Sequence, residues 1–281
     1  MTKLNQTVDF LGCQLGKSSS GDYFLSQSSY IKKFLQHYTP IIRPATTPLP
    51  PREQWIIKPR HSREAQFSFR EALGKLGYLR YSRPDLLHSI HYLAKLPHQQ
   101  TERVARSAIL HTFGCLLNTI DYKLTFYAKP PLPLSQSTLV GFSDAAFAVD
   151  THTRKSCGGH CIYYNQNLIG AQSGAQSRVT TSSGEAELTA IYACGKDMVF
   201  FQGLLNNLQE PKPLTAILTE SSSSIQTIQG EVSSRFKFFR YIFISWKSWP
   251  PRQASRSLTF LEIKTQQNCL QNNRQQKSSK N

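Results

Sequence analysis

Two kinds of hydrophobic spacing divide the chain into segments that predict helices and strands. In the first 130 residues, apolar side chains recur mostly every three or four positions, as on one face of a helix. We expect a hairpin over 8–27 and helices over 30–38, 68–98 and 101–118, the second broken at Arg83-Pro84-Asp85. Five prolines between positions 40 and 51 predict an extended linker, because each lacks an amide donor and disfavours helix in the residue before it.

The pattern changes after Ser137. Short apolar runs predict strands over 139–144, 158–164, 168–173 and 214–219. A long helix is expected from Ser182, since Ser182 and Glu185 have the spacing of a capping box and apolar residues then recur on one face as far as Leu208. Another helix is expected over 224–229. The order strand, strand, strand, helix, strand, helix predicts a mixed α/β domain.

These patterns divide the chain into six segments. They are 1–38 (hairpin and helix), 39–67 (Pro-rich linker), 68–128 (helical region), 129–137 (second Pro-rich linker), 138–230 (mixed α/β domain) and 231–281 (basic tail). The second Pro-rich stretch, at 130–133, is the clearest domain boundary, because the hydrophobic spacing changes directly after it.

The net charge of the chain favours some classes of binding partner over others. The 281 residues include 33 Lys and Arg against 17 Asp and Glu, a net charge of +16, and residues 231–281 alone hold ten basic and two acidic residues. Such an excess favours phosphate-rich partners such as nucleic acids. No apolar run approaches the roughly 18 residues of a membrane-spanning helix, and no signal peptide is recognisable. We therefore expect no membrane partner, no secretion, and a cytoplasmic or nuclear location.

The six cysteines are scattered, which indicates a reducing compartment rather than a disulfide framework. Cys157, His160 and Cys161 resemble half of a zinc site, but no second ligand pair follows at a suitable spacing. We interpret the two cysteines as small apolar residues on a strand.

Three acidic residues lie at the ends of predicted elements in the α/β domain. Asp144 closes the first strand, Glu187 lies in the first turns of the long helix, and Glu220 closes the fourth strand. Clustered carboxylates repel one another, so they need a cation, and hard oxygen ligands select Mg²⁺ or Mn²⁺. The alternative is that each acid is a solvated turn residue, and spacing alone does not decide between the two.

Several motifs, in order over residues 8–230, resemble the Pol polyprotein of copia-type retrotransposons. The motifs are Phe10-Leu11-Gly12, Leu25-Ser26-Gln27-Ser28-Ser29-Tyr30-Ile31, Arg70 to Leu79, Arg83-Pro84-Asp85, Ile120 to Leu124, Gly141 to Ala145, Arg154-Lys155-Ser156, Ser182 to Leu188 and Leu218 to Ser221. The resemblance implies the end of a reverse transcriptase, a small and mostly helical thumb or connection region, followed by a ribonuclease H-like domain with a mixed sheet and helices.

The resemblance also implies roles for particular residues. Asp144, Glu187 and Glu220 match three metal-binding catalytic carboxylates of the ribonuclease H domain, and Glu185 is left as the capping residue. An intact domain of this family hydrolyses the RNA strand of an RNA–DNA hybrid with two Mg²⁺ ions. The implied partners are an RNA–DNA hybrid or other nucleic acid and the rest of a Pol polyprotein.

The chain departs from the family in ways that predict weak or absent nuclease activity. Glu220 stands where the family has aspartate, and the extra methylene displaces the carboxylate by about 1.3–1.5 Å. Gln271 stands where a fourth aspartate is expected, and a neutral amide supplies no negative charge. No two aspartates are adjacent anywhere in the chain, so the polymerase signature is absent and no polymerase activity is expected.

Two other interpretations stay open. The chain could be a non-catalytic basic protein that binds nucleic acid, or a transposon relic without a selected role. In residues 231–281, aromatic and basic residues alternate, which is typical of a surface that stacks bases and binds phosphates. We favour the alternative that this tail has drifted from its ancestral sequence and that its last part is disordered.

Overall fold

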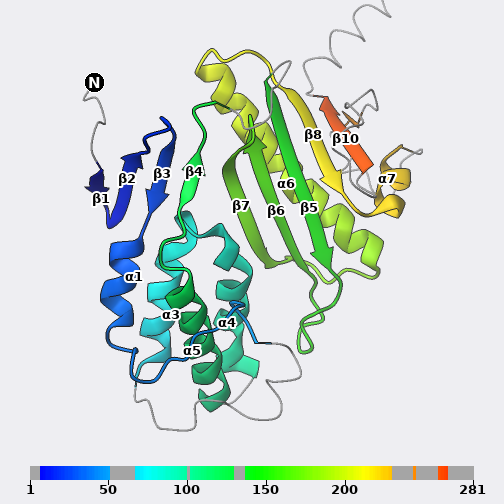
Figure 1. Ribbon diagram of the computed structural model, residues 1–281. Helices are drawn as coiled ribbons and strands as arrows, with labels where there is room; N and C mark the ends of the chain where they lie inside the picture. Colours follow the sequence, from blue (N-terminus) through cyan, green and yellow to red (C-terminus); the bar gives the residue numbers. More distant parts are fainter. Residues whose placement is uncertain are drawn as a thin grey trace, which may run out of the picture. The chain divides into compact units, whose positions relative to one another are not determined.

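The computed structural model describes residues 7–50, 67–99, 102–129 and 137–229, together with the backbone of two short strands, Phe243–Ile244 and Thr259–Lys264. The chain divides into two compact units, Met1–Lys129 (unit 1) and Pro130–Asn281 (unit 2). Both contain helices and a β-sheet (Figure 1), which confirms the predicted mixed α/β class. No helix of the described residues is long and apolar enough to cross a membrane.

Unit 1 combines an antiparallel sheet with a group of helices. Its strands, in sheet order, are β1 (Val8–Phe10), β2 (Cys13–Lys17), β3 (Tyr23–Ser26) and β4 (Leu124–Phe126). Its helices are α1 (Ser28–Leu35), α3 (Phe69–Gly77), α4 (Leu87–Gln99) and α5 (Glu102–Asn118), with short 3-10 turns at Tyr78–Tyr81 and Pro84–Leu86. The expected hairpin is therefore two successive hairpins, and β4 joins the sheet from far along the chain.

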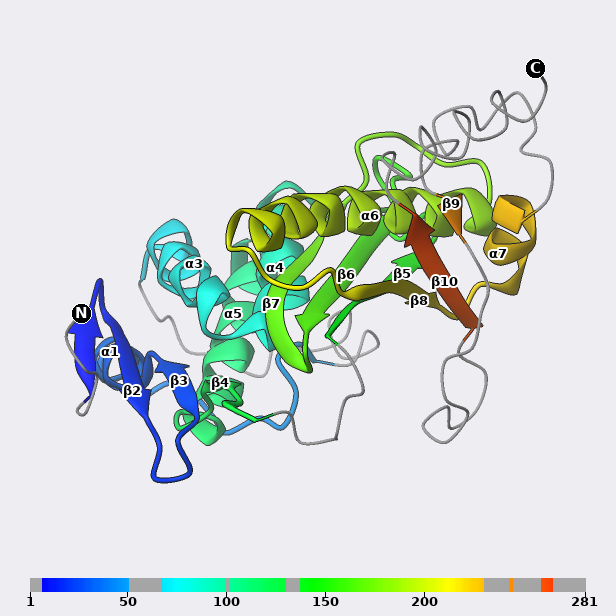
Figure 2. The ribbon, with the colours of Figure 1, turned by 90° about the horizontal axis from the view of Figure 1, so that it is seen from above.

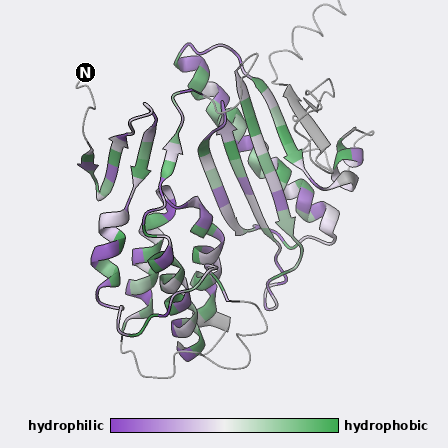
Figure 3. Cartoon of the chain, viewed as in Figure 1, coloured by the Kyte–Doolittle hydropathy of each residue, from purple (hydrophilic) through white to green (hydrophobic). Residues whose placement is uncertain are grey.

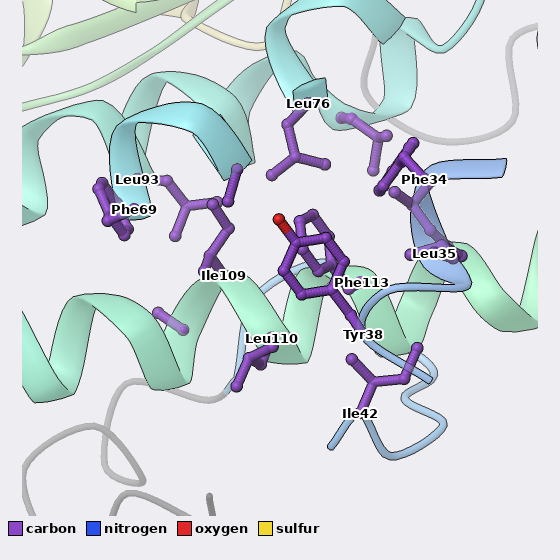
Figure 4. Close-up of a cluster of buried hydrophobic side chains, with 14 of the residues drawn as sticks. Phe34, Leu35, Tyr38, Ile42, Phe69, Leu76, Leu93, Ile109, Leu110 and Phe113 are labelled. Atoms are coloured by element: carbon purple, nitrogen blue, oxygen red, sulfur yellow. The ribbon is translucent and has the colours of Figure 1, made fainter. Parts of the chain in front are cut away.

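The core of unit 1 lies between the helices, as Figure 4 shows. The ring of Phe113 on α5 lies 5.3 Å from the ring of Phe34 on α1 and 4.8 Å from that of Tyr38, between ring centroids. Offset aromatic contacts of this kind add stability beyond the area that they bury. The periodic apolar residues of α1, α3, α4 and α5 thus form one core.

The expected helix break at Arg83 is confirmed, and at this break the buried Arg83 forms an ion pair with the exposed Asp85. Arg83 is 2% exposed, and its Nε and Nη2 donate to the two carboxylate oxygens of Asp85 at 2.9 and 2.8 Å. Its Nη1 and Nη2 also donate to the carbonyl and the hydroxyl of Thr119, both at 2.9 Å. One guanidinium therefore connects the break before α4 to the end of α5.

The first part of the expected linker packs on unit 1. Ile42 is buried in the core, the hydroxyl of Thr112 on α5 donates to the carbonyl of Pro48 at 2.8 Å, and Asn118 donates to the carbonyl of Ala45 at 3.0 Å. Residues 39–50 therefore lie against α5, whereas residues 51–66 lie outside the described residues.

Gly114 allows this close approach, and its replacement tests it. A Cβ at position 114 would collide with the backbone carbonyl of Arg43, so we expect Gly114→Ala to lower the free energy of unfolding of unit 1 by about 1–3 kcal/mol. The matched control is Gly74→Ala on α3, where an added Cβ meets nothing within 4 Å and should stabilise by up to about 1 kcal/mol. Urea denaturation measures both, and equal effects of the two changes would contradict the packing at Gly114.

Unit 2 is a mixed sheet with one long helix along it. Its strands are β5 (Thr138–Ala146), β6 (Cys157–Tyr164), β7 (Asn167–Ala175), β8 (Leu214–Thr219), β9 (Phe243–Ile244) and β10 (Thr259–Lys264), in the sheet order β7-β6-β5-β8-β10-β9. Its helices are α6 (Ser183–Asn207) and α7 (Ser222–Gln229). The pair β5–β8 is parallel and the other pairs are antiparallel.

Helix α6 begins and packs largely as its sequence predicts. The hydroxyl of Ser182 accepts a hydrogen bond from the amide of Glu185 at 3.1 Å, which confirms the predicted cap. Figure 2 shows α6 running along the sheet, and its residues Ile191 and Met198 are buried against it. Leu208, which we expected on the same buried face, is 64% exposed because the helix ends at Asn207.

The sheet carries its hydrophobic residues on the strands that α6 covers. Leu139 of β5 and Ile217 of β8 are fully buried in the same cluster as Ile191, and Figure 3 shows hydrophobic residues along both strands. Gly141 of β5 lies directly under Cys194 and Met198, so that a side chain there would displace both. The alternation along β5 therefore sets which residues face α6 and leaves Asp144 exposed near the end of the strand, which continues to Ala146.

Candidate carboxylate site

Four elements of unit 2 meet at one end of its sheet. Strands β5 and β8 run parallel, so their carboxyl ends lie at the same edge. Because β6 is antiparallel to both β5 and β7, β7 also ends there, and α6 begins after it. Contrary to the prediction, Asp144 does not close its strand, because β5 continues to Ala146 through its pairing with β6. Asp144 near the end of β5, Glu220 directly after β8 and Glu187 in the second turn of α6 nevertheless share this end of the sheet.

The structure brings Asp144 and Glu187 together. Glu187 is half-buried and its pKa is raised from 4.5 to about 7. Burial is the largest cause, and the negative charge of Asp144 and a hydrogen bond between the two side chains raise the pKa further, while the amide of Ala145 opposes the shift. A carboxyl group that is half-protonated near neutral pH is typical of two carboxylates that share a site.

Glu220 is less closely involved. Its charge is the smallest of the contributions that raise the pKa of Glu187, and its side chain is exposed. Within residues 7–50, 67–99, 102–129 and 137–229, no three His, Cys, Asp or Glu side chains form a group that could hold a metal ion. The structure therefore pairs two of the three predicted site residues and does not bring the third into a group with them.

Glu185 lies two residues before Glu187, but its carboxylate binds Thr181 at the start of α6. Its Oε2 accepts hydrogen bonds from the amide and the hydroxyl of Thr181 at 2.6 and 2.7 Å, and these bonds lower its pKa. A carboxylate held in this way stabilises the start of α6. Of the two glutamates, only Glu187 faces the end of β5.

The donor chemistry of the pair suits a hard divalent cation. Oε2 of Glu187 is buried and has no hydrogen-bond partner among the described residues, and a buried carboxylate oxygen left in this state is costly. A cation bound between Asp144 and Glu187 would supply the missing partner and favour the ionised form. The two residues thus fit part of the carboxylate set that the resemblance implies.

The structure also locates the residues that resembled half of a zinc site. Cys157 is buried at the start of β6, and His160 lies on the same strand, where its Nε2 is 2.8 Å from a carboxylate oxygen of Asp197 on α6. The cysteines occupy strand positions, as expected. Residues 230–242, 245–258 and 265–281, which include Gln271, lie outside the described residues. Of the tail, the structure describes the backbone of β9 and β10, and β10 pairs with β8, which the sequence did not predict.

Comparison with known proteins agrees with the Pol resemblance. Over 200 residues the chain is 28% identical to the retrovirus-related Pol polyprotein from transposon RE1 of Arabidopsis thaliana, an overlap of 71% of this chain. The chain is similar to retrotransposon Pol polyproteins. It is also 26% identical over 234 residues, 80% of the chain, to the retrovirus-related Pol polyprotein from transposon TNT 1-94 of Nicotiana tabacum.

A third relative is an uncharacterized mitochondrial protein of Arabidopsis thaliana, 28% identical over 194 residues, which are 68% of this chain and 77% of that protein. The chain spans only 13% of the RE1 polyprotein and 17% of the TNT 1-94 polyprotein. No family model and no solved structure matches the chain. The relatives support a chain derived from a retrotransposon Pol polyprotein.

Proposed function

We propose that unit 2 is a ribonuclease H-like domain of a copia-type Pol polyprotein and that unit 1 derives from the end of its reverse transcriptase. The observation that carries the proposal is the pairing of Asp144, near the end of the central strand β5, with Glu187 on the helix that packs against that strand. The order of strands and helices in unit 2 and the Pol relatives support it. The Asp144–Glu187 pair and the order of elements from β5 to α7 do not involve residues 231–281.

In this proposal Asp144 and Glu187 hold Mg²⁺ or Mn²⁺, with Glu220 as a third, weaker contact. When bound, the metal ions would activate water and stabilise the charge that develops during hydrolysis of the RNA strand of an RNA–DNA hybrid. The chain's own contribution is to hold two carboxylates side by side and to shield one of them from solvent. Glu187 must lose its proton to bind a cation, so binding strengthens as the pH rises through about 7.

The activity that we propose is weak. Mg²⁺ requires near-ideal octahedral geometry, and the longer side chain of Glu220 does not join Asp144 and Glu187 in one group. The neutral Gln271 adds no charge at the position that the resemblance assigns to a fourth aspartate. We therefore expect slow hydrolysis that depends more on Mn²⁺, which tolerates irregular oxygen sites better, than on Mg²⁺.

The test is cleavage of a labelled RNA–DNA hybrid by the purified full chain, with each metal in turn. We expect slow Mn²⁺-dependent cleavage that falls by roughly 100-fold or more in Asp144→Asn. Glu185→Gln is the control, because that residue caps α6 and should leave the rate within a few-fold of wild type. Cleavage that Asp144→Asn does not change would contradict the assignment, as would failure of the wild type both to cleave and to bind Mn²⁺ in calorimetry.

The net charge of +16 supports a second candidate, a non-catalytic protein that binds nucleic acid. Under this alternative the chain binds hybrid equally well with or without divalent cations and never cleaves it. A steep dependence of affinity on salt is common to both candidates, so only the response to metal distinguishes them.

A further inference from the structure

We infer that two loops beside the carboxylate pair, residues 147–156 and 176–182, form a platform that binds the phosphate backbone of a nucleic acid through Arg154, Lys155 and Arg178. The nucleic acid as ligand rests on the proposed function, whereas the hydrogen bonds that join the two loops do not depend on it. The first loop joins β5 to β6 and the second joins β7 to α6. Both therefore lie at the end of the sheet that carries Asp144 and Glu187.

Ser156 ties the two loops together. It is fully buried, and its hydroxyl accepts from the amide of Ala148 at 3.0 Å and hydrogen-bonds the hydroxyl of Thr180 at 2.7 Å. Its carbonyl accepts from the amide of Gln176 at 2.9 Å. One residue thus fixes the first loop internally and joins it to the second, so the two behave as one surface.

Asp150 shapes the first loop from within. Its carboxylate accepts from the amides of His152 and Thr153 at 3.0 and 2.9 Å, and its carbonyl accepts from the amide of Arg154 at 2.8 Å. Asp150 is only 8% exposed, so its negative charge is satisfied inside the loop. Arg154 follows in a left-handed conformation, with φ of 57°, and is exposed.

The charges that the platform presents outward are consequently all positive. Arg154 and Arg178 are exposed and Lys155 is half-buried, while Asp150 is the only acidic residue in the two loops and is buried. The same two loops also carry exposed apolar side chains: Phe147 is 40% exposed and Val179 is 53% exposed. A rigid loop has no need of an exposed aromatic ring for its own stability.

This combination favours a nucleic acid over another polyanion. Arginines present planar donors that match phosphate oxygens, and an exposed ring in the same loops can stack on a base or pack on a sugar. An acidic peptide offers carboxylates to the cations but no base for the ring of Phe147 to stack on. The platform therefore fits a sequence-independent grip on a strand whose backbone passes beside the carboxylate pair.

The experiment measures binding of the full chain to a fluorescent RNA–DNA hybrid by anisotropy, in EDTA so that cleavage plays no part, between about 50 and 200 mM salt. We expect Arg154→Asn, which tolerates the left-handed backbone, and Arg178→Ala each to reduce the slope of log affinity against log salt by about 1. Phe147→Ala should weaken binding roughly 5- to 10-fold and leave the slope unchanged. The matched control is Arg103→Ala, an exposed arginine on α5 of unit 1.

The outcomes separate this inference from the proposed function. Unchanged slopes in both platform variants, or an equal change in Arg103→Ala, would overturn the platform even if the protein cleaves hybrids. The platform would also be overturned if heparin and unlabelled hybrid competed equally well and all variants lost affinity equally. The site would then bind any polyanion. Changed slopes in a protein that never cleaves would support the platform and count against the nuclease.

Discussion

The Glu187→Gln variant is expected to be more stable than the wild-type protein at pH 8 and to lose its response to divalent cations. The pKa of Glu187 is raised to about 7 in the folded protein, from an ordinary value of 4.5. Each pKa unit corresponds to roughly 1.4 kcal/mol, and partial exposure of the side chain reduces the effect. We expect a gain on the order of 2 kcal/mol in the free energy of unfolding of unit 2.

The direction of the pH dependence follows from the sign of this shift. Between pH 4.5 and about 7 the folded state keeps a proton that the unfolded state has lost, so the wild type loses stability as the pH rises through this window. Below pH 4.5 both states are protonated and the penalty is absent. The two proteins should therefore have similar stability at pH 4 and differ most above pH 7.

Thermal unfolding as a function of pH, with and without Mn²⁺, measures both parts of this prediction. At pH 8, Mn²⁺ should raise the melting temperature of the wild type and have no such effect on Glu187→Gln, because a ligand that binds only the folded state stabilises it. Glu185→Gln should instead lose stability above its own lowered pKa, since its carboxylate caps α6. A Glu187→Gln variant less stable than wild type at pH 8 would contradict the pairing of the half-buried Glu187 with Asp144.

Arg83→Ala is expected to destabilise unit 1 by about 3–4 kcal/mol. The change removes a side chain that is 2% exposed and leaves the carbonyl of Thr119 without its donor. Arg83→Lys keeps the charge, but one ammonium group cannot donate to both carboxylate oxygens of Asp85 and to Thr119 at once. We therefore expect the free energy of unfolding to fall by about 2 kcal/mol. These losses are a large fraction of the stability of an ordinary domain.

Urea denaturation of the full chain, with circular dichroism and tyrosine fluorescence as probes, measures these values. Arg103→Ala on α5 is the control and should change stability by no more than about 0.5 kcal/mol, since that arginine is exposed. If Arg83→Lys is as stable as the wild type, the planar geometry of the guanidinium is not what holds the helix break in place.

Helices and strands whose ends are set by neighbouring residues could be predicted, and strands that depend on distant pairing could not. The break before α4 is set by Pro84, which has no amide proton, and the start of α6 is set by Ser182, whose hydroxyl accepts from the amide of Glu185. Strand β4 was not predicted because it has three residues and depends on pairing with β3, which lies about 100 positions earlier in the chain. For the same reason β10, which pairs with β8, could not be found from its own residues.

The sequence by itself determined most helices and strands of both units, but not β4, β9 or β10. It also placed Asp144, Glu187 and Glu220 near the ends of their elements, because spacing, caps and turns act over a few residues. The tertiary structure alone decided that Asp144 and Glu187 become a pair while Glu220 does not complete a group of three. It also decided that Asp150 and Ser156 are buried and hold two loops together. These properties depend on burial and on distances between atoms far apart in the chain, and no short-range pattern carries that information.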